Sequence, residues 1–153
     1  MAVRVSAGLV MYRWRAGRLE FFLAHPGGPF SRQKDDGHWT IPKGEPNADE
    51  PLLDVAQREF EEETGIKPCG PYLELGAIQQ KGGKWVHAWG FEGECSGPIC
   101  SNTFEMEWPP KSGNLCDFPE VDRAEFFSLS EARRKIKEAQ FPLLERLASA
   151  LAD

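Results

Sequence analysis

The sequence has no apolar run approaching the roughly 20 residues that a membrane-spanning helix needs. Its N-terminal stretch, MAVRVSAGLVMYRW, enters an alternating pattern at once and shows no signal-peptide cleavage site. The four cysteines form no CxxC pair, and no histidine stands at zinc-finger spacing; they are Cys69, Cys95, Cys100 and Cys116. We therefore expect a cytoplasmic protein with reduced thiols and no membrane anchor, disulfide or structural zinc.

The chain is also short of positive charge. It has 18 Lys and Arg residues against 24 Asp and Glu residues, which gives a net charge of −6. Affinity for nucleic acids comes largely from cationic side chains that meet phosphates, so this balance argues against DNA and makes RNA a less favoured partner. With 153 residues and 41% hydrophobic residues, we expect one globular domain spanning residues 1–153.

The N-terminal third predicts strands and a surface loop. In residues 3–12, apolar side chains at every second position, from Val3 to Met11, alternate with a mostly more polar set, from Arg4 to Tyr12. This is the pattern of a strand with one buried face. Residues 19–24 predict a second strand, joined to the first as a hairpin across a turn at Ala16-Gly17. Residues 26–38 are rich in Gly, Pro and polar groups and predict a loop, which the short apolar piece 39–41 follows.

The C-terminal half predicts more strands and then helices. Strands are expected at residues 72–80 and 84–92, joined at Gly82-Gly83, and at 101–108 and 123–129, with 109–119 as a long polar loop. Ser128 and Glu131 have capping-box spacing and predict a helix over 129–139, and Pro142 starts a second one that ends near Leu151. This order indicates an α+β fold, a mixed sheet with helices packed on its faces.

A central helix is predicted by GEPNADEPLLDVAQREFEEETGI, residues 44–66. It should run from about Glu50 to Thr64, with Asp49 as N-cap and Gly65 as its C-terminal stop. Four apolar residues fall on one stripe that can bury against the sheet: Leu52, Leu53, Ala56 and Phe60.

Acidic side chains crowd beside that stripe. At about 100° per residue, Glu59, Glu62 and Glu63 share an arc of about 100°, and Glu61 points to the far side. Each such like-charged pair destabilises a helix by a few tenths of a kcal/mol, so the cluster favours a bound cation. Carboxylate oxygens suit Mg²⁺ or Mn²⁺. The alternative is a solvated acidic face, which is what most charge runs are.

The whole segment fits the nine-position signature of the Nudix hydrolase family without a gap: Gly44, Glu50, Arg58, Glu59, Phe60, Glu62, Glu63, Gly65 and Ile66. The chain therefore resembles a Nudix hydrolase. The resemblance implies an α/β/α sandwich around a mixed sheet. It also implies hydrolysis of a nucleoside diphosphate linked to another group X, with a divalent metal and water.

The resemblance also implies site roles. Glu59, Glu62 and Glu63 would bind the metal together with the backbone carbonyl of Gly44. Glu59 would also be a candidate general base, with Glu62 in the catalytic group. Arg58 would orient a catalytic glutamate; its alternative is a surface ion pair on the helix.

Other acids are candidates for a further metal ligand or base. Glu120 is the first choice because it opens a strand beside a long loop, and Glu105 and Glu107 are the second. The alternative for each is an exposed surface acid. Glu50 stands at the helix start, where a carboxylate favours the dipole, so we expect a structural role.

Substrate contacts are expected from Lys43, which directly precedes the signature, and from Arg4, Lys84 and Trp39. Arg13 and Lys81 are further candidates for phosphate. A nucleobase could stack on Trp39, or on one of Trp85, Trp89 and Trp108, although packing is the more usual role of a tryptophan.

The substrate class rests on short motifs. The Pro42-Lys43-Gly44 entry resembles dinucleoside polyphosphate hydrolases of the family. Gly82 stands where ADP-ribose hydrolases have a proline, and Gly83 and Lys84 stand where diadenosine polyphosphate hydrolases have a tyrosine. The leading prediction is a dinucleoside polyphosphate or a nucleoside triphosphate. Removal of pyrophosphate from RNA 5′ ends and a non-catalytic nucleotide sensor are the alternatives, and both monomer and homodimer stay open.

Overall fold

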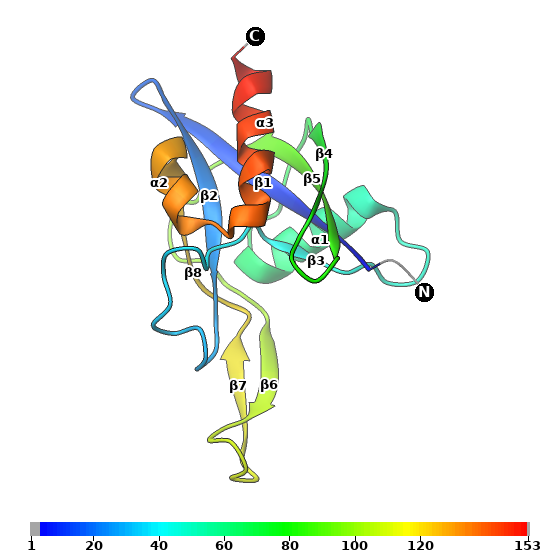
Figure 1. Ribbon diagram of the computed structural model, residues 1–153, viewed down its shortest axis with the longest axis vertical. Helices are drawn as coiled ribbons and strands as arrows, with labels where there is room; N and C mark the ends of the chain where they lie inside the picture. The colour runs from blue at the N-terminus through cyan, green and yellow to red at the C-terminus, as the bar shows by residue number, and fades with distance from the viewer. Residues whose placement is uncertain (1–3, 153) are drawn as a thin grey trace.

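The computed structural model describes residues 4–152 and has a mixed sheet between two layers of helix (Figure 1). Six strands form the sheet in the order β4-β5-β1-β2-β8, with β3 paired to β1; β1 and β5 run parallel, and the other pairs are antiparallel. The strands are β1 Val5–Arg15, β2 Arg18–Pro26, β3 Lys43–Gly44, β4 Leu73–Gln79, β5 Trp85–Glu92, β6 Thr103–Glu107, β7 Leu115–Pro119 and β8 Val121–Ser128. The helices are α1 Leu52–Thr64, α2 Leu129–Lys135, the 3-10 helix η1 Glu138–Gln140, and α3 Phe141–Leu151.

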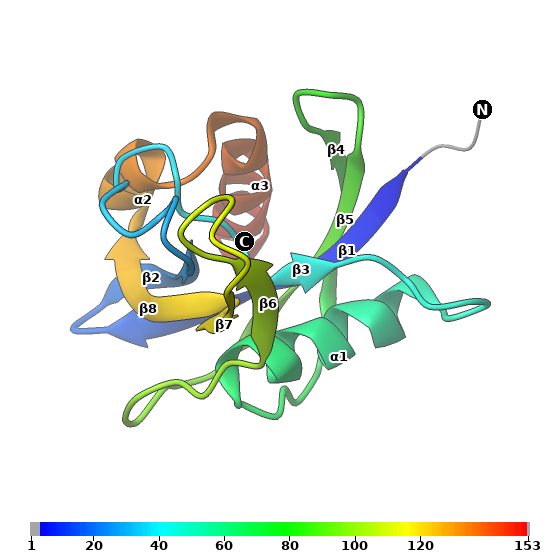
Figure 2. The same cartoon turned by 90° about the horizontal axis from the view of Figure 1, so that it is seen from below.

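The helices cover opposite faces of the sheet, which confirms the expected sandwich. Figure 2 shows α1 on one side and α2 with α3 on the other. Strand β1 packs against helices on both of its faces. Val10 belongs to the buried cluster that includes α2 and α3, whereas Leu9 and Met11 belong to the buried cluster that includes α1. The prediction of one buried face for this strand was therefore wrong, because β1 lies inside the sheet and every residue from Ser6 to Met11 is buried.

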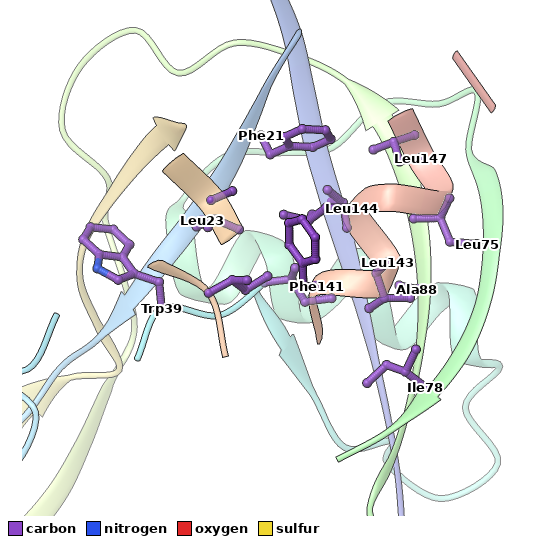
Figure 3. Close-up of a cluster of buried hydrophobic side chains, with 14 of the residues drawn as sticks. Phe21, Leu23, Trp39, Leu75, Ile78, Ala88, Phe141, Leu143, Leu144 and Leu147 are labelled. Carbon is purple, nitrogen blue, oxygen red and sulfur yellow. The ribbon is translucent and has the colours of Figure 1, made fainter. Parts of the chain in front are cut away.

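The larger core cluster lies under α3. Leu143, Leu144 and Leu147 are fully buried and point from α3 toward the sheet, where Phe21 and Ile78 meet them (Figure 3). Their spacing of three and four residues places them on one helical face, so the pattern in the sequence explains why this helix docks. Pro142 lies in its first turn, as predicted.

A two-stranded hairpin stands apart from the main sheet. β6 and β7 pair antiparallel and project from the body of the molecule (Figure 1). The polar loop expected over residues 109–119 is therefore only partly a loop, because residues 115–119 are a strand. Phe104 and Phe118 are paired across the two strands with ring centroids 6.1 Å apart. That contact supplies the cross-strand packing which stabilises such a hairpin.

The helix predicted over residues 129–139 is shorter than expected. The Ser128 and Glu131 capping box is present, but α2 ends at Lys135, and Ile136 has extended backbone. There the Lys137 backbone N–H donates to the Trp39 carbonyl at 2.8 Å. This long-range hydrogen bond competes with helix continuation, which local propensity alone does not reveal.

Within residues 4–152, no helix combines the length and the apolar character that a bilayer crossing requires.

Candidate active site

The acidic helix is fixed by its ends and by its apolar stripe. Gly65 has φ 77°, and its N–H donates to the Glu61 carbonyl at 2.8 Å, so the predicted C-terminal stop is confirmed. Ala56 and Phe60 are fully buried, and the Phe60 ring lies 5.2 Å from that of Phe91. The helix is thereby held on the sheet in one rotation, which sets the direction of its carboxylates.

The start of α1 differs from the prediction. Asp49 does not cap the helix; Pro51 is the N-cap residue, without a side-chain hydrogen bond. The Glu50 carboxylate accepts from the Asn47 backbone N–H at 3.0 Å and from Arg58, and Asp49 has φ 59°. This turn holds Glu50 outside the helix and against Arg58, and the structural role of Glu50 stays a prediction.

Arg58 links the carboxylates of the site. Its Nε and Nη2 donate to the two oxygens of Glu50, each at 2.9 Å. Its Nη1 donates to Glu59 at 3.2 Å and to both oxygens of Glu62 at 3.3 Å, and its Nη2 also reaches the Glu45 carbonyl at 3.1 Å. These contacts raise the pKa of Arg58 and exclude a simple surface ion pair. They fit the expected orienting role.

Gly44 lies directly under the Glu59 carboxylate. A methyl group at Gly44 would overlap all three atoms of that carboxylate. β3 brings Gly44 there by pairing with Ala7 of β1. Glycine at this position therefore allows the backbone of the turn and the Glu59 side chain to share one small space.

Glu63 is the most buried of the acids, with 8% of the residue exposed, whereas Glu61 is exposed, as the helical wheel predicted. Burial, followed by the charges of Glu59 and Glu120, raises the pKa of Glu63 to about 8. The Lys43 charge, followed by the Lys43 backbone N–H, opposes the rise. In its ionised form, the Glu63 carboxylate therefore has too little positive charge around it to neutralise it.

Neighbouring acids show the same excess of negative charge. Burial, and then the charge of Glu62, raises the pKa of both Glu59 and Glu120. Glu120 joins β7 to β8, far along the chain from α1, and the fold brings it to the cluster. Its predicted position is therefore supported, and its role as a ligand stays a prediction.

Glu105 and Glu107 lie elsewhere. Both are on the projecting β6 strand, and the Glu107 carboxylate accepts from the backbone N–H groups of Lys111 and Gly113 at 2.9 and 3.0 Å. Glu107 therefore closes the turn of the hairpin. The pKa shifts of Glu59, Glu63 and Glu120 arise from other residues.

The donor set fits a hard divalent cation. It offers carboxylate oxygens from Glu59, Glu62, Glu63 and Glu120, which are the ligands that Mg²⁺ and Mn²⁺ prefer. Within residues 4–152 no three such side chains are yet close enough to coordinate one ion. The Arg58 Nη1 donates to both Glu59 and Glu62. A cation would compete with Arg58 for their oxygens.

Of the predicted substrate contacts, the cations Lys43, Arg4 and Lys84 lie near one another, whereas Trp39 lies in the core. Lys84 approaches Glu45 at 3.9 Å, Arg4 donates to the same carboxylate at 3.3 Å, and Lys84 lies close enough to Lys43 to lower its pKa. These cations gather at Glu45, next to Gly44, and their substrate role stays a prediction. Trp85 adjoins them and is 38% exposed.

Trp39 was a wrong choice as a nucleobase platform. It is 2% exposed, its Nε1 donates to Asp35 at 2.8 Å, and its ring packs against Phe127 and His25. Because the Trp39 ring is buried against Phe127 and His25, it has no free face on which a nucleobase could stack. Lys137, whose backbone N–H donates to the Trp39 carbonyl, was missed because it falls within the helix predicted over residues 129–139.

Comparisons with known proteins agree with this geometry. The model of the NUDIX domain family matches residues 3–147 of the chain. An asymmetrical bis(5′-nucleosyl)-tetraphosphatase of Caenorhabditis elegans is 41% identical over 61 residues, a match that spans 40% of this chain and 40% of that protein.

Solved structures extend the likeness to the whole fold. A C. elegans Ap4A hydrolase binary complex superposes with a TM-score of 0.68 and 26% identity over 98% of each chain. The NUDIX domain of Shewanella oneidensis NrtR, complexed with ADP ribose, has a TM-score of 0.65 and 17% identity over 99% of this chain and 90% of that one. The second likeness shows the fold alone.

Proposed function

Because this chain belongs to the NUDIX domain family, we propose that it is a divalent-metal-dependent pyrophosphohydrolase that cleaves a nucleoside diphosphate linked to a group X. The observation that carries the proposal is the cluster of Glu59, Glu62, Glu63 and Glu120, in which Arg58 binds Glu59 and Glu62 and Gly44 leaves space for Glu59. The substrate is a dinucleoside polyphosphate or a nucleoside triphosphate. The likeness to the C. elegans tetraphosphatase supports the first of these.

Glu59, Glu62, Glu63 and Glu120, with the Gly44 carbonyl, would hold Mg²⁺ or Mn²⁺. Such an ion offsets phosphate charge and makes a bound water more acidic. This explains how a chain of net charge −6 accepts a polyanion.

The protein side chains supply position and proton transfer. Arg58 fixes the directions of Glu59 and Glu62 through its Nη1. Glu59 is the proposed proton acceptor for the attacking water, and its raised pKa moves its basicity toward neutral pH. Lys43, beside Glu63, offers positive charge to a phosphate at the edge of the cluster.

A hydrolysis panel with product identification tests this function. The panel holds diadenosine tetraphosphate, nucleoside triphosphates, ADP-ribose and 5′-triphosphate RNA, each with Mg²⁺ or Mn²⁺. Glu62→Gln and Glu63→Gln should each lower turnover by about 100-fold or more, because loss of a carboxylate ligand removes several kcal/mol of charge stabilisation. Glu61→Gln is the matched control and should stay within about twofold. Equal losses at all three positions, or no turnover beside an active control enzyme, would refute the proposal.

A further inference from the structure

A cavity of about 620 Å³ lies between the tip of the β4–β5 hairpin and the segment that joins α2 to α3. Its lining is Gly37, Gln80, Lys81, Lys137, Glu138 and Ala139. The lining contains two ammonium groups and no aromatic ring. Nucleobases are generally held by stacking on aromatic side chains, so this cavity lacks the feature that would hold one.

The cavity is connected to the acid cluster by lysines. Gln80, which lines the cavity, donates its backbone N–H to the Lys84 carbonyl at 2.8 Å, and the Lys84 ammonium group lies 3.9 Å from the Glu45 carboxylate, two residues after Lys43. The backbone enforces this proximity: the Lys137 N–H donates to the Trp39 carbonyl at 2.8 Å, four residues before Lys43. These contacts bring the segments that carry Lys84 and Lys137 next to the segment that carries Lys43.

The walls of the cavity are held rigidly. Buried Gln140 donates to the Gln80 side chain at 2.8 Å and accepts from the Ile41 backbone N–H at 3.0 Å. These bonds tie the β4–β5 hairpin to η1 and to the chain that leads into β3. The backbone segments that carry Lys81 and Lys137 are therefore placed by the fold.

Two of these lysines lack a counter-ion. Among the described residues 4–152, no carboxylate lies within 4 Å of the Lys43 or Lys137 ammonium group. Lys137 is half-buried, and burial, followed by the Lys84 charge, lowers its pKa. Cations held near one another out of water favour an anion between them. Glu138 is the one acid in the lining, and its negative charge would weaken the binding of an anion there.

We propose that this cavity holds a terminal phosphate of group X, bound by Lys137 and Lys81, so that the enzyme prefers nucleoside polyphosphates with a free phosphate end to dinucleoside polyphosphates. This rests on the proposed function and selects between its two substrate classes. The proposal concerns group X alone and says nothing about which base the nucleoside diphosphate carries.

Adenosine 5′-tetraphosphate and diadenosine tetraphosphate provide the test, because they share four phosphates and differ in the second nucleoside. With Mg²⁺, the wild type should show the lower KM for adenosine tetraphosphate. Lys137→Gln should raise that KM about tenfold, as expected for loss of a charged phosphate contact, with kcat changed less than about twofold. Glu138→Gln should lower the same KM, and Lys137→Arg should retain the wild-type value.

Lys67→Gln, an exposed lysine after α1, is the charge-matched control and should change neither KM. A lower wild-type KM for diadenosine tetraphosphate, or an equal effect of Lys137→Gln on both substrates, would overturn the inference.

Binding of inorganic tripolyphosphate by calorimetry separates this inference from the proposed function. If neither nucleotide is hydrolysed, the proposed function fails. Tripolyphosphate binding that Lys137→Gln weakens about tenfold would still support the phosphate cavity. Absence of tripolyphosphate binding to the wild type would overturn it, whatever the turnover.

Discussion

Arg58 donates two hydrogen bonds of 2.9 Å to the Glu50 carboxylate, and the same guanidinium also donates to Glu59 and Glu62. The turn before α1 is thus joined to the acids on α1 through one side chain. Planar bidentate geometry of this kind fixes direction as well as distance.

Arg58→Lys should lower kcat by about 10- to 100-fold, because an ammonium group cannot hold Glu50 bidentately while it orients Glu59 and Glu62. The thermal midpoint should fall much less than activity does. Arg134→Lys is the control, since Arg134 makes a single exposed contact with Asp36 at 3.4 Å. Steady-state kinetics and a thermal melt measure both effects, and an unchanged kcat would show that Arg58 does not position the glutamates.

Gly44→Ala should destabilise the protein by about 1–3 kcal/mol, because the added methyl overlaps the Glu59 carboxylate. Urea unfolding measures the loss. The double variant Gly44→Ala with Glu59→Ala should recover most of it, since the overlapping group is then absent. A double variant as unstable as the sum of the two single variants would place the strain elsewhere.

Stability of the metal-free protein should depend on pH through Glu63. Its pKa is about 8 in the folded chain against an ordinary 4.5, so between these values the folded state binds more protons than the unfolded state. The free energy of unfolding should therefore fall as pH rises from about 4.5 to about 8. Glu63→Gln should flatten this slope, and Glu61→Gln should retain it.

Urea unfolding in a chelator at about pH 5 and about pH 8 checks that sign. Lys43 acts at higher pH: its folded pKa of about 8 lies below the ordinary 10.5, so stability should rise again between these two values. A Glu63→Gln variant with the wild-type slope would show that another group carries the dependence.

Glu120→Gln should raise the Mg²⁺ concentration for half-maximal activity by about tenfold, since this carboxylate shares the acid cluster. Glu105→Gln removes an equal charge from the exposed hairpin strand and should leave the Mg²⁺ dependence unchanged. A magnesium titration of activity measures both. Identical curves for Glu120→Gln and the wild type would remove Glu120 from the ligand set.

Local patterns predicted much of the fold. Alternation and turn chemistry gave the β1–β2 and β4–β5 hairpins, and the Ser128 and Glu131 capping box gave the start of α2. Two predictions failed because they depended on distant partners: the loop over residues 115–119 and the open face of Trp39. The sequence of residues 115–119 does not show that Phe118 meets Phe104, and the Trp39 ring does not reveal that Phe127 and His25 will cover it.

By itself, the sequence determined the chemistry of the acidic helix. The 3.6-residue period separates Glu61 from Glu59, Glu62 and Glu63, and the spacing of the apolar stripe decides which side faces the sheet. These are properties of one continuous segment, so no knowledge of the rest of the chain is required.

Only the tertiary structure decided which charges surround that helix. Glu120 joins the acids, and Lys84 and Lys137 join Lys43, across separations of many residues. Such encounters depend on strand order and on hydrogen bonds like that from Lys137 to Trp39. Electrostatic interaction depends on distance in space, and the sequence encodes that distance only through the whole fold.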